Sequence, residues 1–311
     1  MKKTLLAMLC GGLLLTSQVA MAKNIVIGAP MVSFADKWQT YLQDSLRDFD
    51  AKHDDVEIKL TDANADPEKQ LSQVENFIHE KVDALLVVPT DPTIVKKIGR
   101  LAKKANIPLI VVNRKPNDED MKLVTSYVGS DEIEAGRIQA DYVINTLNGK
   151  DAEALVLMGV LGQDAATKRT EGVKEIFAQH KNTKVSSEQE GKWERDRGQT
   201  IAENVLAANK KINVIVSNND EMAIGAYLAT KKLGLKDEDV LIVGVDATPD
   251  ALEFLGKGLD ATVFQSAQGQ GYTGAETAYK AAKGEKVEHV NWVPFELVVP
   301  ADKEKYQAKY K

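Results

Sequence analysis

The chain has 311 residues, a formal net charge of −6 and a single cysteine. A mildly acidic balance argues against binding to nucleic acid or to an anionic membrane surface. One cysteine excludes an intramolecular disulfide framework and a cysteine-rich metal site. The length predicts two domains of ordinary size.

The first 22 residues are typical of a cleavable secretory signal peptide. Two lysines precede an apolar run from Leu5 to Leu15, and Ala20 and Ala22 provide the small residues that a signal peptidase reads. The run is shorter than the stretch of about 20 apolar residues that a transmembrane helix needs. A lipoprotein signal is the other alternative, but the lipidated residue would be Cys10, which follows bulky side chains. We therefore predict a signal peptide over residues 1–22 and a mature, cysteine-free chain in the periplasm.

Along the rest of the chain, short apolar runs rich in β-branched residues alternate with amphipathic stretches of helical length. The runs predict eight buried strands: Asn24–Ala29, Val56–Thr61, Ala84–Pro89, Pro108–Asn113, Ala154–Val160, Val214–Asn218, Val240–Val245 and Ala261–Phe264. The clearest helix is Pro67–Glu80, with Asp66 as its N-cap and proline at its first position. Such alternation predicts an α/β fold of parallel sheets with helices on both faces.

These units are too many for one sheet, so we divide the chain into two lobes, the second beginning near residues 129–131. In open α/β sheets, ligands bind at the carboxyl ends of the strands. Polar side chains follow four of the predicted strands directly: Asn113-Arg114, Asn218-Asn219-Asp220, Asp246 and Gln265. Each alone fits an ordinary turn equally well, but their recurrence at one end of the sheets favours a binding site.

Five sequence motifs carry a family resemblance over the whole mature chain: Val88–Asp91, Val112–Arg114, Tyr127–Asp131, Asn219–Ala226 and Val243–Pro249. With them the chain resembles the ribose, galactose and inositol branch of the periplasmic sugar-binding proteins, the solute receptors of ABC importers. The resemblance implies the type I periplasmic binding protein fold, in which two doubly wound parallel-sheet lobes are joined by a three-strand hinge. It also implies that the chain crosses back near Ser266 and again near Pro294. The expected N-terminal lobe is then residues 23–129 and 266–293, and the C-terminal lobe is residues 130–265 and 294–311.

The resemblance also implies a set of ligand-binding residues drawn from both lobes. They are Phe34, Asp36, Trp38, Asn113, Arg114, Asp164, Arg169, Trp193, Asn219, Asp246 and Gln265. Trp38 and Trp193 would stack on opposite faces of the ligand, with Phe34 sharing the role of Trp38. The chemistry agrees, because a sugar or cyclitol ring has apolar faces for the indoles and a rim of hydroxyls that bond carboxylates, guanidinium groups and amides.

Several of these side chains also have an ordinary structural interpretation. Trp38 and Trp193 could pack on neighbouring helices, and Arg169 could pair with Glu171 or Glu175 on an exposed helix. Asp220 is better explained as a helix N-cap than as a ligand contact. The third tryptophan, Trp292, is expected in the core beside Val293 and Phe295.

Motifs for catalysis, nucleotide binding and metal binding are missing from the sequence. It has no dinucleotide-binding or phosphate-binding glycine loop and no nucleophile elbow. The four histidines have no metal spacing, and residues 234–239 lack the calcium loop that some hexose-binding relatives carry. Asp36 and Asp246 could suggest a glycosidase, but nearby arginines should keep both ionised. We therefore expect no catalytic residue, no metal and no cofactor.

The expected function is capture of a cyclic polyol or monosaccharide by hinge closure, followed by delivery to an ABC permease. Myo-inositol is the first choice, with galactose or glucose next and ribose behind. A chemoreceptor remains open as a second partner, and a monomer is expected. The alternatives are a repressor of the same fold, which would need a helix-turn-helix and no signal peptide, a glycosidase, and a receptor for a furanosyl signalling molecule.

Overall fold

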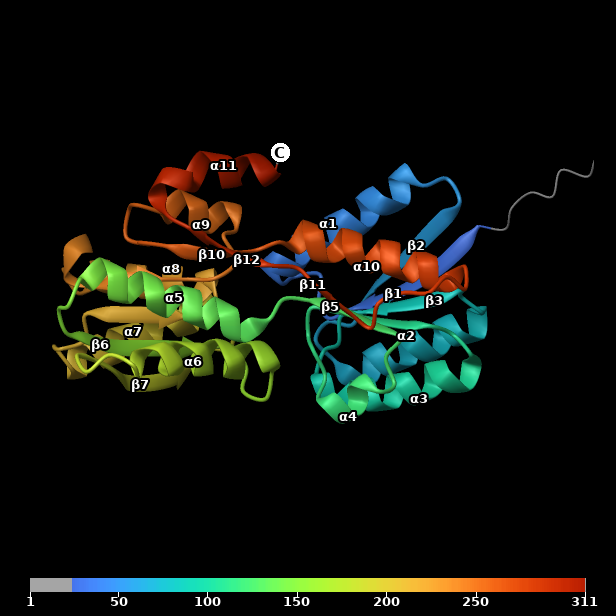
Figure 1. Cartoon of the computed structure of the whole chain (residues 1–311), viewed down its shortest axis with the longest axis horizontal. Helices are drawn as coiled ribbons and strands as arrows, with labels where there is room; N and C mark the ends of the chain where they lie inside the picture. Colours follow the sequence, from blue (N-terminus) through green and yellow to red (C-terminus); the bar gives the residue numbers. More distant parts are fainter. Residues whose placement is uncertain (1–23, 311) are drawn as a thin grey trace, which may run out of the picture.

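Two lobes lie side by side along the long axis of the molecule, each built on a sheet with helices on both faces (Figure 1). The structure is a computed structural model that describes residues 24–310. The predicted signal peptide therefore lies outside the described residues. Within residues 24–310, no helix is long and apolar enough to cross a membrane.

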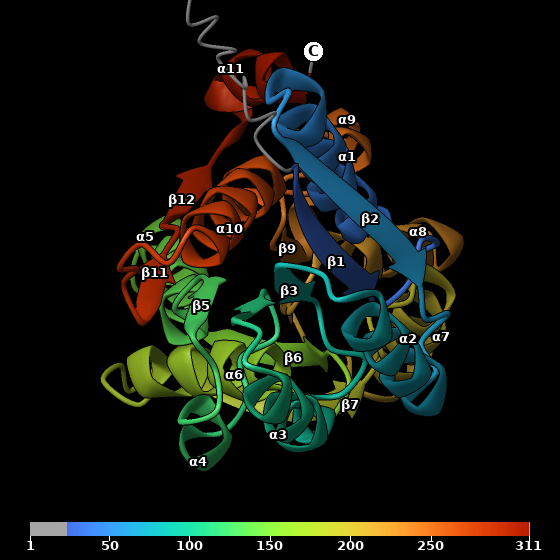
Figure 2. The same ribbon diagram turned by 90° about the vertical axis from the view of Figure 1, so that its right-hand side faces the viewer.

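The sheet of the first lobe has six parallel strands in the order β11-β5-β4-β3-β1-β2. The strands are β1 (Ile25–Met31), β2 (Val56–Asp62), β3 (Ala84–Val87), β4 (Leu109–Val112), β5 (Ser126–Gly129) and β11 (Val290–Trp292). Helices α1 (Lys37–Lys52) and α10 (Ala267–Ala282) pack together on one face, as Figure 2 shows. Helices α2 (Pro67–Glu80) and α3 (Val95–Ala105) cover the other face, with the short α4 (Asp118–Met121) beside α3.

The second lobe contains a four-stranded parallel sheet in the order β7-β6-β8-β9 and an antiparallel pair, β10 and β12. The strands are β6 (Ala152–Met158), β7 (Thr183–Glu190), β8 (Val214–Ser217), β9 (Leu241–Val243), β10 (Thr262–Gln265) and β12 (Phe295–Val298). Helices α5 (Glu132–Leu147) and α6 (Asp164–Phe177) cover one face. Helices α7 (Arg195–Ala208), α8 (Asp220–Lys232) and α9 (Pro249–Phe254) cover the other, and α11 (Lys303–Gln307) follows β12.

The central strands carry apolar side chains on both faces of each sheet because helices cover both faces. In β3, Leu85 and Val87 pack with α2 and α3, whereas Leu86 packs with α1 and α10. In β6, Leu155 and Leu157 contribute to one cluster and Val156 to the other. Successive side chains of a strand point to opposite faces, so the apolar runs in the sequence show no alternation.

Helix α2 forms as its sequence predicts, with the same first and last residues. The Asp66 side chain accepts hydrogen bonds from the backbone N–H of Glu68 at 2.9 Å and of Lys69 at 3.1 Å. The helix ends where Lys81 takes a left-handed conformation with φ 59°. The α/β class and the parallel sheets are likewise confirmed.

Four strands, β5, β7, β11 and β12, were not among the eight predicted. Strand β7 reads Thr-Lys-Val-Ser-Ser-Glu-Gln-Glu and lies at the edge of its sheet, with alternating half-buried and exposed side chains. Edge strands tolerate charged side chains, so β7 lacks the apolar pattern. The expectation that Trp292 lies in the core is wrong: the side chain is 52% exposed at the edge strand β11.

The chain passes between the two lobes three times, and further contacts join the lobes on the α1 side. The passages follow β5, β10 and β11. Tyr41 of α1 and Tyr310 near the carboxyl terminus have ring centroids 4.8 Å apart, and Lys37 lies 3.4 Å from Asp250. Tyr310 also packs against the second-lobe cluster around Phe264. The lobes are therefore held in contact beside the hinge.

Two tyrosines near the carboxyl terminus, one with a bonded hydroxyl and one without, allow a matched test of what a buried hydroxyl contributes to stability. The Tyr306 hydroxyl donates to Glu296 at 2.7 Å, whereas the buried Tyr310 hydroxyl has no hydrogen-bond partner among residues 24–310. We expect Tyr306→Phe to lower the free energy of unfolding by about 1 kcal/mol. Tyr310→Phe should leave it unchanged or raise it, because a buried unpaired hydroxyl is lost. Urea denaturation measures both, and an equal loss in the two variants would show that the Tyr310 hydroxyl is bonded.

Candidate functional site

A cavity lies between the two lobes, at the carboxyl ends of strands from both. Its volume is about 70 Å³. The cavity is lined by Asp36, Trp38, Gln39, Asn113, Arg114, Gln163, Asp164, Ala165, Arg169, Trp193, Asn219, Asp246 and Gln265.

Ten of the predicted site residues line this cavity, and Phe34 does not. Phe34 packs against the first-lobe core, with the Arg47 guanidinium 5.9 Å from its ring centroid. Three lining residues were not predicted: Gln39, Gln163 and Ala165. Gln39 lies in the first turn of α1 and Gln163 is the N-cap of α6, so their place at helix starts beside predicted residues could have identified them.

The start of α1 presents its N-cap Asp36 and its second residue, Trp38, to the cavity. Asp36 is the N-cap of α1, and its carboxylate accepts a hydrogen bond from the Gln39 N–H at 3.1 Å. Trp38 is 7% exposed, and its Nε1 donates to the Gln265 carbonyl oxygen at 3.1 Å. The indole is thus held by a bond to β10 of the second lobe.

Asn113 takes a left-handed conformation with φ 67° directly after β4. Its carbonyl oxygen accepts from the Tyr127 hydroxyl at 2.8 Å. Its side-chain amide accepts from Gln39 and donates to Gln270, both at 3.2 Å. These bonds hold the Asn113 amide in one orientation at the cavity wall.

Arg114 is anchored to the loop after β3. Its Nη1 donates to the carbonyl oxygens of Pro89 at 3.2 Å and Thr90 at 2.7 Å. Burial lowers the pKa of the Arg114 guanidinium from its ordinary value, and the carboxylates of Asp36 and Asp91 oppose that effect. The guanidinium is therefore a positioned cation on the first-lobe wall.

Trp193 occupies the second-lobe wall in a left-handed conformation with φ 70°. Its Nε1 donates to Gln163 Oε1 at 2.9 Å, and its carbonyl oxygen accepts from Asn219 Nδ2 at 3.2 Å. The indole lies against Gly159, where an added Cβ would stand 1.9 Å from Trp193 Cζ2. Only glycine at position 159 lets the ring lie there.

Arg169 is buried on α6 and does not form the exposed pair that was the alternative interpretation. Its Nε donates to Glu132 at 2.7 Å and its Nη1 to the Asn218 carbonyl oxygen at 2.5 Å. The other two acidic residues are engaged elsewhere: Glu171 with Lys168, and Glu175 with Arg137. The pairing of Arg169 with Glu171 or Glu175 is therefore wrong.

Asp246 is 5% exposed, in an unusual backbone conformation with φ 128°. Within residues 24–310, no group donates a hydrogen bond to its carboxylate, which lines the cavity. Burial first, and then the neighbouring Asp220, raise the pKa of Asp246 well above its ordinary value, while Arg169 acts in the opposite direction. Burial thus outweighs the effect of Arg169, and the net shift in the pKa of Asp246 is opposite in direction to the effect expected from the arginines. A ligand hydroxyl would give this carboxylate the donor it lacks.

Asp220 lies behind Asp246 and is not the N-cap of α8. That position is taken by Asn219, whose Oδ1 accepts from the Met222 N–H at 3.1 Å. Asp220 accepts instead from Thr262 Oγ1 and the Ala247 N–H, both at 2.7 Å. Burial raises the pKa of Asp220 to about 7, against the effect of these hydrogen bonds.

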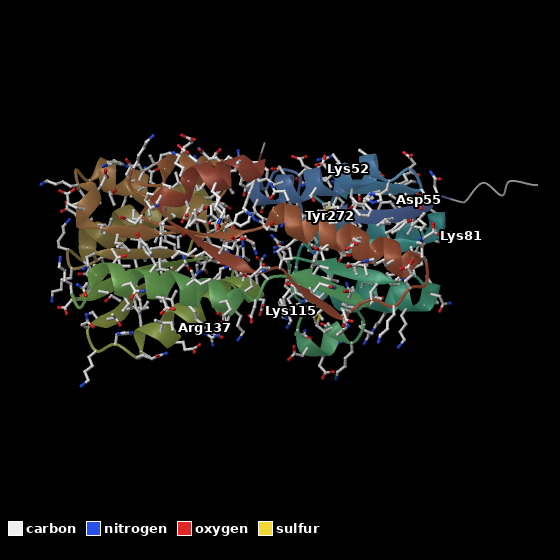
Figure 3. The ribbon with its side chains drawn as sticks, turned by 45° about the horizontal axis from the view of Figure 1, so that its top comes forward. Lys52, Asp55, Lys81, Lys115, Arg137 and Tyr272 are labelled. Atoms are coloured by element: carbon white, nitrogen blue, oxygen red, sulfur yellow. The ribbon has the colours of Figure 1, made fainter. Side chains whose placement is uncertain are left out.

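Asp164 at the start of α6 completes the charged part of the cavity wall. Burial raises the pKa of Asp164, and Lys115 and Lys168 act against that shift. Lys115 belongs to the first lobe and lies near the boundary between the lobes (Figure 3). Across the described part of the chain, no group of three or more His, Cys, Asp or Glu side chains could hold a metal ion.

Comparisons with known proteins agree with this architecture. Residues 27–286 match the family described as periplasmic binding protein domain. A putative rhizopine-binding protein of Rhizobium meliloti is 39% identical over 299 residues, which cover 95% of this chain and 96% of the relative. The ribose import binding protein of Escherichia coli (strain K12) is 34% identical over 243 residues, which cover 78% and 80%. A solved ABC transporter solute binding protein from Bacillus halodurans with bound myo-inositol is 40% identical, with a TM-score of 0.88 over 94% of this chain and 100% of that one. These relatives are solute-binding receptors and not enzymes.

The raised pKa of Asp220 predicts a pH dependence of stability. Between its ordinary pKa of 3.8 and its folded value of about 7, the folded state holds a proton that the unfolded state has released. The free energy of unfolding should therefore fall as the pH rises through this window, by at most about 1.4 kcal/mol per pH unit. Asp220→Asn keeps an acceptor and a donor without the ionisation, so its fall should be smaller. Denaturation across this window measures both proteins, and identical profiles would contradict the shift.

Proposed function

The chain belongs to the periplasmic binding protein family, and from that premise we propose that it captures a cyclic polyol or monosaccharide between its lobes and delivers it to the permease of an ABC importer. The observation that carries the proposal is one cavity lined by a tryptophan from each lobe and by charged and amide side chains from both. Delivery to a permease implies action in the periplasm, in agreement with the predicted signal peptide.

The chemistry of the lining matches a hydroxylated ring. Trp38 and Trp193 offer apolar surface for the C–H faces of the ring, and their N–H groups are already bonded within the protein. Around them, carboxylates accept hydrogen bonds from ring hydroxyls, guanidinium groups donate to them, and amides do both. Bonds to the charged groups are the stronger ones. A ring lacking one hydroxyl would leave a buried group unpaired, at a cost of about 1–3 kcal/mol.

Myo-inositol is the ligand that we propose first. The Bacillus halodurans protein solved with myo-inositol shares 40% of its residues with this chain, and the Escherichia coli ribose import protein shares 34%. The family's ribose receptors stack phenylalanines and use an Asp-Arg pair, whereas this cavity has Trp38, Trp193 and the pair Asn113-Arg114. Galactose, glucose and ribose follow as alternatives.

Capture by hinge closure is supported by the contacts that join the lobes. Trp38 is bonded to Gln265 and Lys37 is paired with Asp250, each across the lobe boundary. Both lobes contribute to the cavity wall, so a ligand stabilises the arrangement in which the lobes meet. We further propose that the protein acts as a monomer, and that the closed lobes present one surface to the permease. A chemoreceptor is a further candidate partner of that surface.

A thermal-shift screen over cyclitols and sugars tests the ligand. A ligand that binds only the folded state raises stability with the logarithm of its concentration, by about 2.7 kcal/mol at a hundred times Kd. Myo-inositol should raise the Tm most, and galactose, glucose and ribose less. A shift with a hexose but none with myo-inositol would make the first choice wrong. No shift with any of these ligands would contradict the proposed function.

Replacing tryptophan by alanine tests the stacking surface. Trp193→Ala removes the indole from the cavity wall, and we expect the affinity for myo-inositol to fall at least about tenfold, or about 1.4 kcal/mol. Trp292→Ala is the matched control, because Trp292 is 52% exposed and does not line the cavity. Isothermal titration calorimetry measures both variants. Equal affinity in Trp193→Ala and the wild type would show that the ring does not stack there.

A further inference from the structure

Glu132 is a buried carboxylate beside the cavity that does not line it. It is the first residue of α5, immediately after the first passage of the chain between the lobes, and it is 2% exposed. Nothing in the sequence motifs singles it out, because an acidic residue in the first turn of a helix is common and is ordinarily a solvent-exposed charge.

Both oxygens of Glu132 bond side chains that do line the cavity. Oε2 accepts from Arg169 Nε at 2.7 Å, and Oε1 accepts from Gln265 Nε2 at 3.3 Å. Arg169 lies on α6 of the second lobe, and Gln265 ends β10 just before the chain returns to the first lobe. One carboxylate thus joins a second-lobe ligand candidate to a residue of the hinge.

Arg169 uses two of its three guanidinium nitrogens in bonds within the protein, which leaves the third, Nη2, for a ligand. Nε is held by Glu132 and Nη1 by the Asn218 carbonyl oxygen. No acceptor among the described residues engages Nη2, and Nη2 is not among the buried atoms without partners. Because Arg169 lines the cavity, Nη2 is the donor that faces the ligand, and Glu132 fixes the plane in which it lies.

The ion pair between Arg169 and Glu132 is buried, so its geometry is costly to change. The side chains of Arg169 and Glu132 are 4% and 2% exposed. Burial raises the pKa of Glu132, and the neighbouring Arg169 opposes that shift. Removing one member of such a pair leaves an uncompensated buried charge. Arg169 without Glu132 would therefore turn toward other carboxylates, of which Asp246 in the cavity is one.

We propose that Glu132 is a positioning residue of the binding site: it holds Arg169 Nη2 toward the ligand and links that donor to the hinge through Gln265. The proposal rests on the proposed function, since it assigns Glu132 a part in the same site. The same helix supplies a matched control in Glu134, which pairs with Arg137 at the surface with side chains 47% and 33% exposed. Arg137 lies on the second lobe (Figure 3), and its Nη2 also donates to Glu175 of α6.

The test compares four proteins by calorimetric titration with myo-inositol: wild type, Glu132→Gln, Arg169→Met and the double variant. Glutamine keeps an acceptor for Gln265 but removes the charge opposite Arg169. We expect Glu132→Gln to weaken binding at least about tenfold, and to have less than about a twofold effect when Arg169 is already methionine. Glu134→Gln should bind as the wild type does. Unchanged affinity in Glu132→Gln, or an equal loss in both backgrounds, would overturn the proposal.

A ligand-free measurement separates this proposal from the proposed function. The Arg169 Nε–H resonance, assigned by its disappearance in Arg169→Met, should be protected from solvent exchange in the wild type and exposed in Glu132→Gln. If the wild type does not bind myo-inositol, the proposed ligand is wrong. The exchange rate of the Arg169 Nε–H resonance still tests whether Glu132 holds Arg169 in place. Rapid exchange in the wild type would overturn it. If Glu132→Gln does not fold, Glu132→Asp takes its place, because it keeps the charge but moves the carboxylate away from Arg169.

Discussion

Parallel pairing of the strands in both lobes places the carboxyl ends of each sheet along one edge, and the passages of the chain turn these two edges toward each other. Asn113 follows β4, Asn219 follows β8 and Gln265 ends β10, yet all three reach one cavity. No local signal brings them together. The right-handed crossovers between parallel strands bring them together at one edge of each sheet. The helices packed on both faces then hold each sheet, and with it these side chains, in position.

Burial disfavours the charged form of the ionisable groups on both walls of the cavity: it lowers the pKa of Arg114 on the first-lobe wall and raises that of the second-lobe carboxyl groups. The carboxylates of Asp246 and Asp164 have raised pKa values because water has been removed from around them. The same removal strengthens each hydrogen bond that a ligand makes. A cavity of this kind favours a molecule that carries many hydroxyl groups. An apolar molecule would leave the same carboxylates and amides unpaired.

The site and the hinge share their supporting bonds. Trp38 is bonded to the backbone of Gln265, and the Gln265 side chain is bonded to Glu132, which in turn holds Arg169. Trp38 and Gln265, which line the cavity, therefore also help to hold the lobes in contact. In the function proposed above, a ligand that changed the packing of Trp38 and Gln265 would also change the relative position of the lobes.

The sequence alone determined the α/β class, the limits of α2 and eight of the strands, because apolar runs, helical periodicity and capping residues act within a few residues of one another. Its motifs, read as a family resemblance, also named ten of the residues that line the cavity. The polar edge strand β7 was missed, since an edge strand needs no apolar pattern. The packing of Phe34 on the first-lobe core, the exposure of Trp292 and the pairing of Glu132 with Arg169 appear only once the chain has folded. Burial and pairing depend on residues far apart in the chain, such as Trp38 and Gln265 with a separation of 227 positions, and no local pattern encodes such a meeting.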